Sequence, residues 1–236
     1  MNKIAIRSKT ATRVGAGSVG FLGVFYRSTV GKKIIMAVTG AIGVGFVIVH
    51  LSLNLLAYAG ASSMNDVDRL LKSTGGWLWL ARAVLITAVV VHVIIAWQLL
   101  RTSRASRPVD YQHWEPVGST FASRTMRWTG VMLLLFIPLH VLHLASGTLH
   151  PDFVADDVYH NVVSAFRVWY VSALYILAMG ILGLHVFHGS WSMFQSVGFN
   201  HPRYRGWIRH LATLVTLVVV LGFISIPIAV LLGILS

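Results

Sequence analysis

The sequence predicts an all-helical integral membrane protein, a bundle of five transmembrane helices without a separate soluble domain. Hydrophobic residues make up 56% of the chain, charged residues only 11%, and the mean hydropathy is +0.74. A soluble domain has about 25% charged residues. Crossing a hydrocarbon core of about 30 Å takes about 20 apolar residues. Five segments meet this requirement: 34–58, 78–100, 128–147, 170–194 and 211–235.

Residues 1–33 form a basic segment ahead of the first span, and residues 34–236 form a single transmembrane domain. The apolar part of the N-terminal segment, "VGAGSVGFLGVFYR", is rich in glycine, is interrupted by Arg27 and lacks a small-residue cleavage pattern. We therefore expect it to be retained, either as a free tail or as a segment that docks on a partner subunit.

Lys and Arg residues are distributed very unevenly along the chain. Of the 19, seven precede the first span, five lie between the second and third, and three lie between the fourth and fifth. Only Arg69, Lys72, Arg82 and Arg167 belong to the other side. The positive-inside rule then places the N-terminus in the cytoplasm and the C-terminus outside. The same rule accounts for the net charge of +12, so a nucleic-acid partner is not expected.

The side chains inside the spans that can carry a positive charge are histidines and one arginine. All seven acids lie in the loops, and Arg82 lies near the outer end of the second span. Histidines occur in four of the five spans: His50, His92, His140 with His143, and His185 with His188. An ionisable group inside a membrane is costly and marks a functional site by default. A lone histidine would be a packing residue, but four helices that each supply one favour a ligand set.

The depths of the histidines sort them into two pairs. Helices one and three run outward, and a rise of 1.5 Å per residue puts His50 and His140 about 25 and 20 Å beyond the nearest basic residues at the inner end. His92 and His185 lie about 13 Å from the inner ends of their helices. The dipeptide Thr-Gly precedes His50 and His140 at the same spacing, which also suggests comparable depths for these two residues.

Two imidazoles at each depth, without thiolate or carboxylate, indicate a particular kind of metal centre. The chain has no cysteine, so it forms no disulfide and holds no iron–sulfur cluster. Zinc takes three or four protein ligands, which two separate pairs do not provide. Haem iron needs only two axial ligands. The economical interpretation is two stacked haems b, each held by two histidines, that carry electrons.

Residues near the proposed ligands have less specific signals. His143 and His188 each lie three residues beyond a ligand; we expect them to contact a haem propionate or a quinone, with direct ligation or a surface role as alternatives. Arg82 is a further candidate for such a contact. Gly180, Gly183 and Gly189 flank His185, where small residues suit either a flat macrocycle or close helix packing.

The segments "GKKIIMAVTGAIGVGFVIVHL", "TGVMLLLFIPLHVLHL" and especially "HVFHGSWSMFQSVG" resemble the five-helix, dihaem cytochrome b subunit of succinate:quinone oxidoreductases. The resemblance extends over nearly all of residues 25 to 235. It implies that His50 and His140 ligate an outer haem b and that His92 and His185 ligate an inner one. Some members of this family have a glutamate where this chain has Gly183, which argues against a carboxylate proton route beside the inner haem here.

The resemblance also implies the partners and location of the chain. It would anchor a flavoprotein and an iron–sulfur subunit to the cytoplasmic face of a bacterial inner membrane and pass electrons between them and a quinone, expected to be menaquinone. Higher oligomers of such a complex are compatible with this interpretation. The isolated chain is not expected to oxidise succinate, and the direction of catalysis stays open. Two alternatives are a dihaem anchor of another respiratory oxidoreductase and a cofactor-free transporter that relays protons through histidines.

Overall fold

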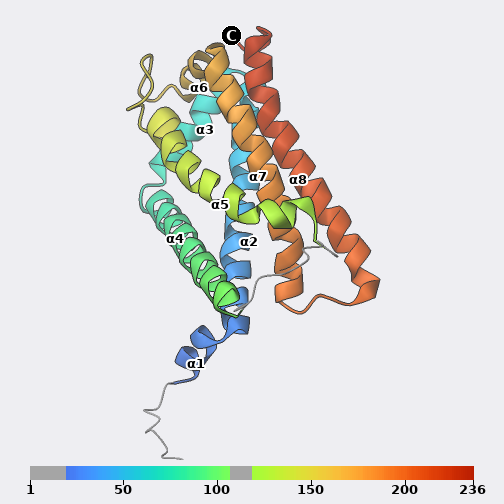
Figure 1. Ribbon diagram of the computed structural model, residues 1–236. Helices are drawn as coiled ribbons and strands as arrows, with labels where there is room; N and C mark the ends of the chain where they lie inside the picture. Colours follow the sequence, from blue (N-terminus) through green and yellow to red (C-terminus); the bar gives the residue numbers. More distant parts are fainter. Residues whose placement is uncertain (1–19, 107–118) are drawn as a thin grey trace, which may run out of the picture.

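The computed structural model describes residues 20–106 and 119–236, and these residues form helices without any strand (Figure 1). Five of the helices are long and apolar enough to cross a membrane, which confirms the five-helix prediction. They are α2 (Thr29–Asn54), α4 (Gly76–Ala105), α5 (Phe121–His140), α7 (Trp169–Ser196) and α8 (Pro202–Leu231). A 3-10 turn, η1 (Leu55–Ala59), extends α2, and a π turn, η2 (Val141–Ala145), extends α5.

The spanning helices are longer than most of the apolar segments. For example, α8 begins at Pro202, nine residues before the expected start at 211, and includes Arg203, Arg205 and Arg209. Proline suits the first helical position, and arginine is a good helix former. Hydropathy marks where a helix contacts hydrocarbon, whereas the backbone hydrogen bonds continue into the basic interfacial residues.

Three shorter helices complete the chain: α1 (Phe21–Arg27), α3 (Ala61–Ser73) and α6 (Val158–Arg167). The expectation that every acid lies in a loop is wrong for Asp66 and Asp68, because both belong to α3. Residues 61–73 form an amphipathic helix. With 13 residues and several charged side chains, this helix is too short and too polar to be recognised as a membrane span. Of the N-terminal segment 1–33, residues 1–19 lie outside the described part, as do residues 107–118 of the loop between α4 and α5.

Helices α2 and α7 form the centre of the bundle. α2 packs against α4, α7 and α8, and α7 packs against α5 and α8. Among the described helices, α2 and α5 share no extended contact, and neither do α4 and α7. The two helices of each predicted ligand pair are therefore separated by other helices of the bundle.

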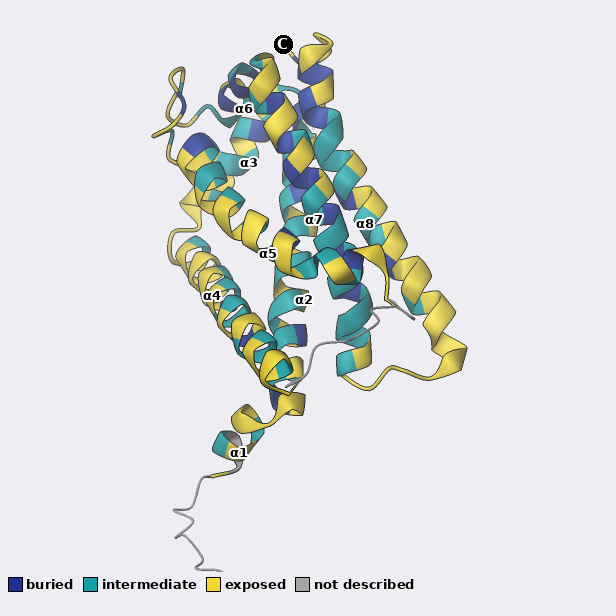
Figure 2. Cartoon of the chain, in the orientation of Figure 1, coloured by how far each residue is buried: buried dark blue, intermediate teal, exposed yellow. Residues whose placement is uncertain are grey.

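The most buried part of the molecule lies at the end of the bundle that contains α3, α6 and the C-terminus, here called the cap end (Figure 2). Its core includes Ala57, Met64, Val162, Phe166 and Tyr175. The other end contains α1, the end of α4 and the α7–α8 connection, and is called the basic end. Large apolar side chains are exposed along the spanning helices between the two ends, as expected of surfaces in contact with lipid.

Charge separates the two ends. Ten described Lys and Arg residues, and no described carboxylate, belong to α1, to the starts of α2, α5 and α8 and to the end of α4: Arg27, Lys32, Lys33, Arg101, Arg104, Arg124, Arg127, Arg203, Arg205 and Arg209. At the cap end, Lys72 donates to Asp156 at 2.6 Å and pairs with Asp68 at 2.7 Å. These bonds raise the pKa of Lys72, and the Lys72 ammonium lowers the pKa of Asp156. The Lys72–Asp156 bond thus connects α3 to the segment just before α6.

Candidate functional site

The first histidine pair lies toward the cap end and joins α2 to α5. The ring centroids of His50 and His140 are 5.7 Å apart, and the ring planes are nearly perpendicular at 81°. His140 is the last residue of α5, where the backbone changes into the π turn η2. Phe46 stacks on His50 at 5.4 Å, and Phe136 stacks on His140 at 5.8 Å. Aromatic side chains therefore enclose both imidazoles.

The second pair lies nearer the basic end and joins α4 to α7. The ring centroids of His92 and His185 are 6.3 Å apart, with an angle of 59° between the planes. Both rings contact a threonine of a neighbouring helix: Thr39 Oγ1 lies 3.0 Å from Nδ1 of His92, and Thr129 Oγ1 lies 3.3 Å from Nδ1 of His185. The structure thus brings together the same two pairs that helix depth indicates.

The spacing of each pair suits two ligands of one metal ion. Nitrogens bonded to a shared ion at roughly 2.0 Å lie about 4 Å apart, which puts the ring centroids about 6 Å apart. The observed separations are 5.7 and 6.3 Å. Each pair also bridges two helices without extended contact. This arrangement is compatible with a flat macrocycle lying between the helices, and the donor set of two neutral imidazoles fits haem iron.

The described residues contain no group of three or more His, Asp or Glu side chains that could hold a metal ion. A zinc site with three or four protein ligands would need such a group.

The other candidate residues have different surroundings. His143 is buried, and its Nδ1 lies 3.0 Å from the Tyr175 hydroxyl. His188 lies one turn beyond His185, half-buried, with no polar partner among the described residues. Arg82 is exposed near the cap end of α4, and its guanidinium lies over the Trp79 ring at 5.0 Å. Contacts of these three residues with a propionate or quinone stay a prediction.

The glycines around His185 differ in their surroundings. A Cβ built on Gly183 would lie 2.6 Å from Cγ2 of Val220 in α8, so Gly183 serves the close packing of α7 on α8. The same Cβ on Gly180 or Gly189 would meet nothing within 4 Å. Of the two roles considered for these glycines, helix packing applies to Gly183. An acidic side chain at this position would collide with α8, in keeping with the expected lack of a carboxylate there.

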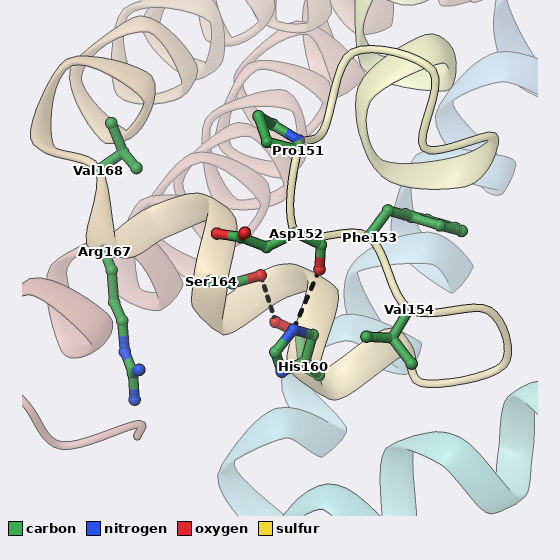
Figure 3. Close-up of a pocket in the computed structure, with 8 residues that line it drawn as sticks. All are labelled: Pro151, Asp152, Phe153, Val154, His160, Ser164, Arg167 and Val168. Carbon is green, nitrogen blue, oxygen red and sulfur yellow. Dashed lines mark hydrogen bonds between the residues drawn. The ribbon is translucent and has the colours of Figure 1, made fainter.

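A polar cluster at the cap end extends from the first pair toward the surface. The ring centroids of His143 and His150 are 5.0 Å apart, and Nε2 of His150 lies 3.0 Å from the Ser164 hydroxyl. Ser164 donates to the His160 carbonyl at 2.8 Å, beside a cavity of about 590 Å³ between residues 151–154 and α6 (Figure 3). His150 lies outside the spans, and burial lowers its pKa. This cavity contains none of the predicted ligands.

Sequence reasoning missed several polar residues that contact the candidate histidines. Tyr175 reads as an ordinary apolar helix position, and its ring centroid is 5.9 Å from that of His140. Thr39 and Thr129 belong to the repeated Thr-Gly dipeptides, from which the sequence indicates only comparable depths for His50 and His140. Their contacts instead involve His92 and His185. The repeat itself was the signal that could have identified them.

Comparison with known proteins found no matching family model, curated protein or solved structure.

Proposed function

We propose that this chain is the haem-carrying membrane subunit of a succinate:quinone oxidoreductase, in which His50 with His140 and His92 with His185 each bind one haem b. The observation that carries the proposal is the placement of two imidazole pairs, at 5.7 and 6.3 Å between ring centroids, across helices that lack extended mutual contact. The sequence resemblance supplies the oxidoreductase class, and the geometry is compatible with it.

A haem with two imidazole ligands carries one electron at a time and has no open position for oxygen. In this proposal, the histidines of α2 and α5 hold one haem and those of α4 and α7 hold the other. The aromatic rings of Phe46, Phe136 and Phe223 exclude water from the first pair, since each lies within 5.8 Å of one of its imidazoles. A dry site at fixed geometry reduces the reorganisation that accompanies electron transfer.

The proposal places the basic end in the cytoplasm, where it would contact the iron–sulfur subunit. Support comes from the ten described cations in α1, at the starts of α2, α5 and α8 and at the end of α4, because Lys and Arg concentrate on the cytoplasmic side of membrane proteins. Electrons would pass between that subunit, the inner pair, the outer pair and a menaquinone. Lipid surrounds the exposed apolar faces of the helices in a bacterial inner membrane.

A spectrum of the purified protein tests the proposal most directly. We expect low-spin haem b bands and about two haems per chain by pyridine haemochrome assay. Subunits that co-purify distinguish this complex from another dihaem oxidoreductase: a flavoprotein and an iron–sulfur protein are expected. A colourless protein that still folds would contradict the proposal and favour the histidine-based transporter, which requires no cofactor.

A further inference from the structure

We propose that Thr39 and Thr129 are positioning residues of the inner histidine pair, each accepting a hydrogen bond from an imidazole Nδ1 and thereby directing Nε2 toward the haem iron. This inference rests on the proposed function and deepens it. The two threonines come from α2 and α5, whereas the histidines that they contact belong to α4 and α7.

The backbone contacts of the hydroxyls favour one direction for each hydrogen bond. Thr39 Oγ1 lies 2.8 Å from the Ile35 carbonyl oxygen, and Thr129 Oγ1 lies 3.1 Å from the Met126 carbonyl oxygen. A hydroxyl has one proton, and a carbonyl can only accept. Once that proton is donated to the backbone, the threonine oxygen can only accept from the imidazole.

The imidazole nitrogen at each contact must then carry the proton. The contacts involve Nδ1, at 3.0 Å for His92 and 3.3 Å for His185. A neutral imidazole has one N–H, so Nε2 of each ring keeps a free lone pair. Hydrogen bonds from the non-ligating nitrogen commonly fix the tautomer and orientation of metal-binding histidines. The threonines therefore select the tautomer that a ligand of the inner site requires.

The glycine after each threonine also lies close to the imidazole that the threonine contacts. A Cβ built on Gly40 would lie 3.5 Å from Cε1 of His92, and one on Gly130 would lie 3.6 Å from Cε1 of His185. Each imidazole thus lies against a Thr-Gly dipeptide of a neighbouring helix, with nearly equal distances in the two halves. This equivalence between α2 and α5 is difficult to attribute to incidental packing.

Among the described residues, no such acceptor contacts the outer pair. Asn54 is a donor to the His50 backbone carbonyl at 2.7 Å, and its amide nitrogen lies 3.4 Å from Nδ1 of His50. Nδ1 of His140 is buried without a hydrogen-bond partner in the described part of the chain. An acceptor on Nδ1 raises the basicity of the ligand and favours ferric iron. The threonines should therefore lower the potential of the inner haem alone.

Redox titration of the purified haem-loaded protein, with any subunits that co-purify, tests this inference. The variants are Thr39→Val and Thr129→Val, which keep the side-chain shape, and Thr39→Ser, which keeps the hydroxyl. Thr213→Val is the matched control, because the exposed Thr213 hydroxyl donates only to the Arg209 carbonyl at 2.9 Å. The inner haem is identified as the one that His50→Ala retains.

We expect both valine variants to shift the midpoint potential of the inner haem upward and to leave that of the outer haem unchanged. Thr39→Ser and Thr213→Val should resemble the parent. Loss of the inner haem in Thr39→Val that Thr39→Ser restores would also support the role of the hydroxyl. Unchanged potentials in both valine variants, equal shifts of both haems, or haem loss that the serine does not restore would overturn it. A parent without haem would refute the proposed function before any variant is made.

Discussion

His50 has an imidazole in a mostly apolar environment. Its neighbours include the rings of Phe46 and Phe223 at 5.4 and 5.7 Å and the ring of His140 at 5.7 Å. The Asn54 amide is the nearest polar side-chain group, at 3.4 Å from Nδ1. Burying a polar group without a good hydrogen bond costs free energy. A bond between an imidazole nitrogen and a metal ion would offset that cost, so this residue offers the sharpest test of the outer site.

Replacement of His50 by alanine should remove or disturb one haem and spare the other. The iron of the outer site would keep one axial ligand in an apolar cavity, so it should become high-spin or lose its porphyrin. Haem content should fall from about two per chain to nearer one, as measured by pyridine haemochrome assay and by low-temperature spectra. His140→Ala should give the same result.

His210→Ala is a suitable control, because His210 is exposed at the basic end of α8. It should keep both haems with unchanged spectra. Two unchanged low-spin haems in His50→Ala would instead make His50 a packing residue, and another histidine would have to be the ligand.

At the scale of single elements, α7 and α8 approach closely at Gly183. Val220 is β-branched and stiff at χ1, so it has few ways to move from a new methyl group placed 2.6 Å from its Cγ2. Gly222 plays the same part where α8 meets α2, because a Cβ built on it would lie 2.8 Å from Cδ1 of Leu51. Small residues therefore determine how near α8 lies to both central helices.

Gly183→Ala should be less stable than Gly180→Ala by about 1–3 kcal/mol because of overpacking, seen as a lower melting temperature in detergent. Gly180→Ala, one turn earlier on α7, is the matched control, because its Cβ would meet nothing within 4 Å. Both variants gain helix propensity of about 1 kcal/mol, so only the collision differs between them. Equal melting temperatures for the two variants would show that α8 can move away without cost.

The contact between α3 and α6 depends on Asp157. Its carboxylate accepts from the His160 backbone N–H at 2.9 Å as the N-cap of α6, and from the Asn65 amide at 2.9 Å. These two bonds lower the pKa of Asp157, with the His160 N–H as the larger cause. A carboxyl whose pKa is lower in the folded state stabilises the fold above its unfolded pKa. That contribution disappears as the pH falls through the folded-state pKa.

Asp157→Ala should therefore lower stability at pH 7 by about 1 kcal/mol, the usual cost of a lost N-cap. The difference from the parent should begin to shrink below about pH 4, the ordinary pKa of an aspartate, and should disappear below the lower pKa of the folded-state carboxyl. Melting temperatures in detergent at the two pH values measure this effect. Asp152→Ala is the control, since the exposed Asp152 side chain has no hydrogen bond among the described residues. A difference that persists in acid would point to lost packing instead of lost charge.

The whole molecule has a strong polarity along its axis. The described Lys and Arg residues are concentrated in α1, at the starts of α2, α5 and α8 and at the end of α4, whereas the described acids lie in α3 and in the segment just before α6. The described chain begins at one end and the C-terminus lies at the other, as an odd number of spans requires. Electrostatics and insertion rules favour the basic end inside the cell.

Labelling of single cysteines tests this orientation without background, because the chain has no cysteine of its own. Asn200→Cys, between α7 and α8, should be protected from a membrane-impermeant thiol reagent in intact cells. Ser62→Cys, exposed in α3, should react. The reverse pattern would overturn the orientation and, with it, the names inner and outer for the two histidine pairs.

The purified single chain should not catalyse succinate-dependent dye reduction. In the proposed function, a separate flavoprotein subunit carries out the succinate chemistry, and this chain supplies only haem and a quinone half-site. Activity should appear only after a flavoprotein subunit is added, measured with an artificial electron acceptor. Succinate oxidation by the chain alone would contradict this division of roles.

Hydropathy and segment length alone determine the number of spans, because each helix must satisfy its own backbone hydrogen bonds in lipid. The histidine depths also follow from the sequence, since the rise per residue is constant and the basic residues mark one end. These two quantities lead to the pairing of His50 with His140 and of His92 with His185. They require no knowledge of which helices touch.

Only the tertiary structure decided which helices pack together and which residues support the histidines. Spanning helices are apolar on nearly every face, so periodicity does not indicate which face meets a neighbour. The rotation and tilt of α2 and α5 therefore had to be known before Thr39 and Thr129 could be placed beside His92 and His185. The roles of Gly183 and of the α3–α6 cap likewise depend on contacts between segments far apart in the chain, which a local pattern does not encode.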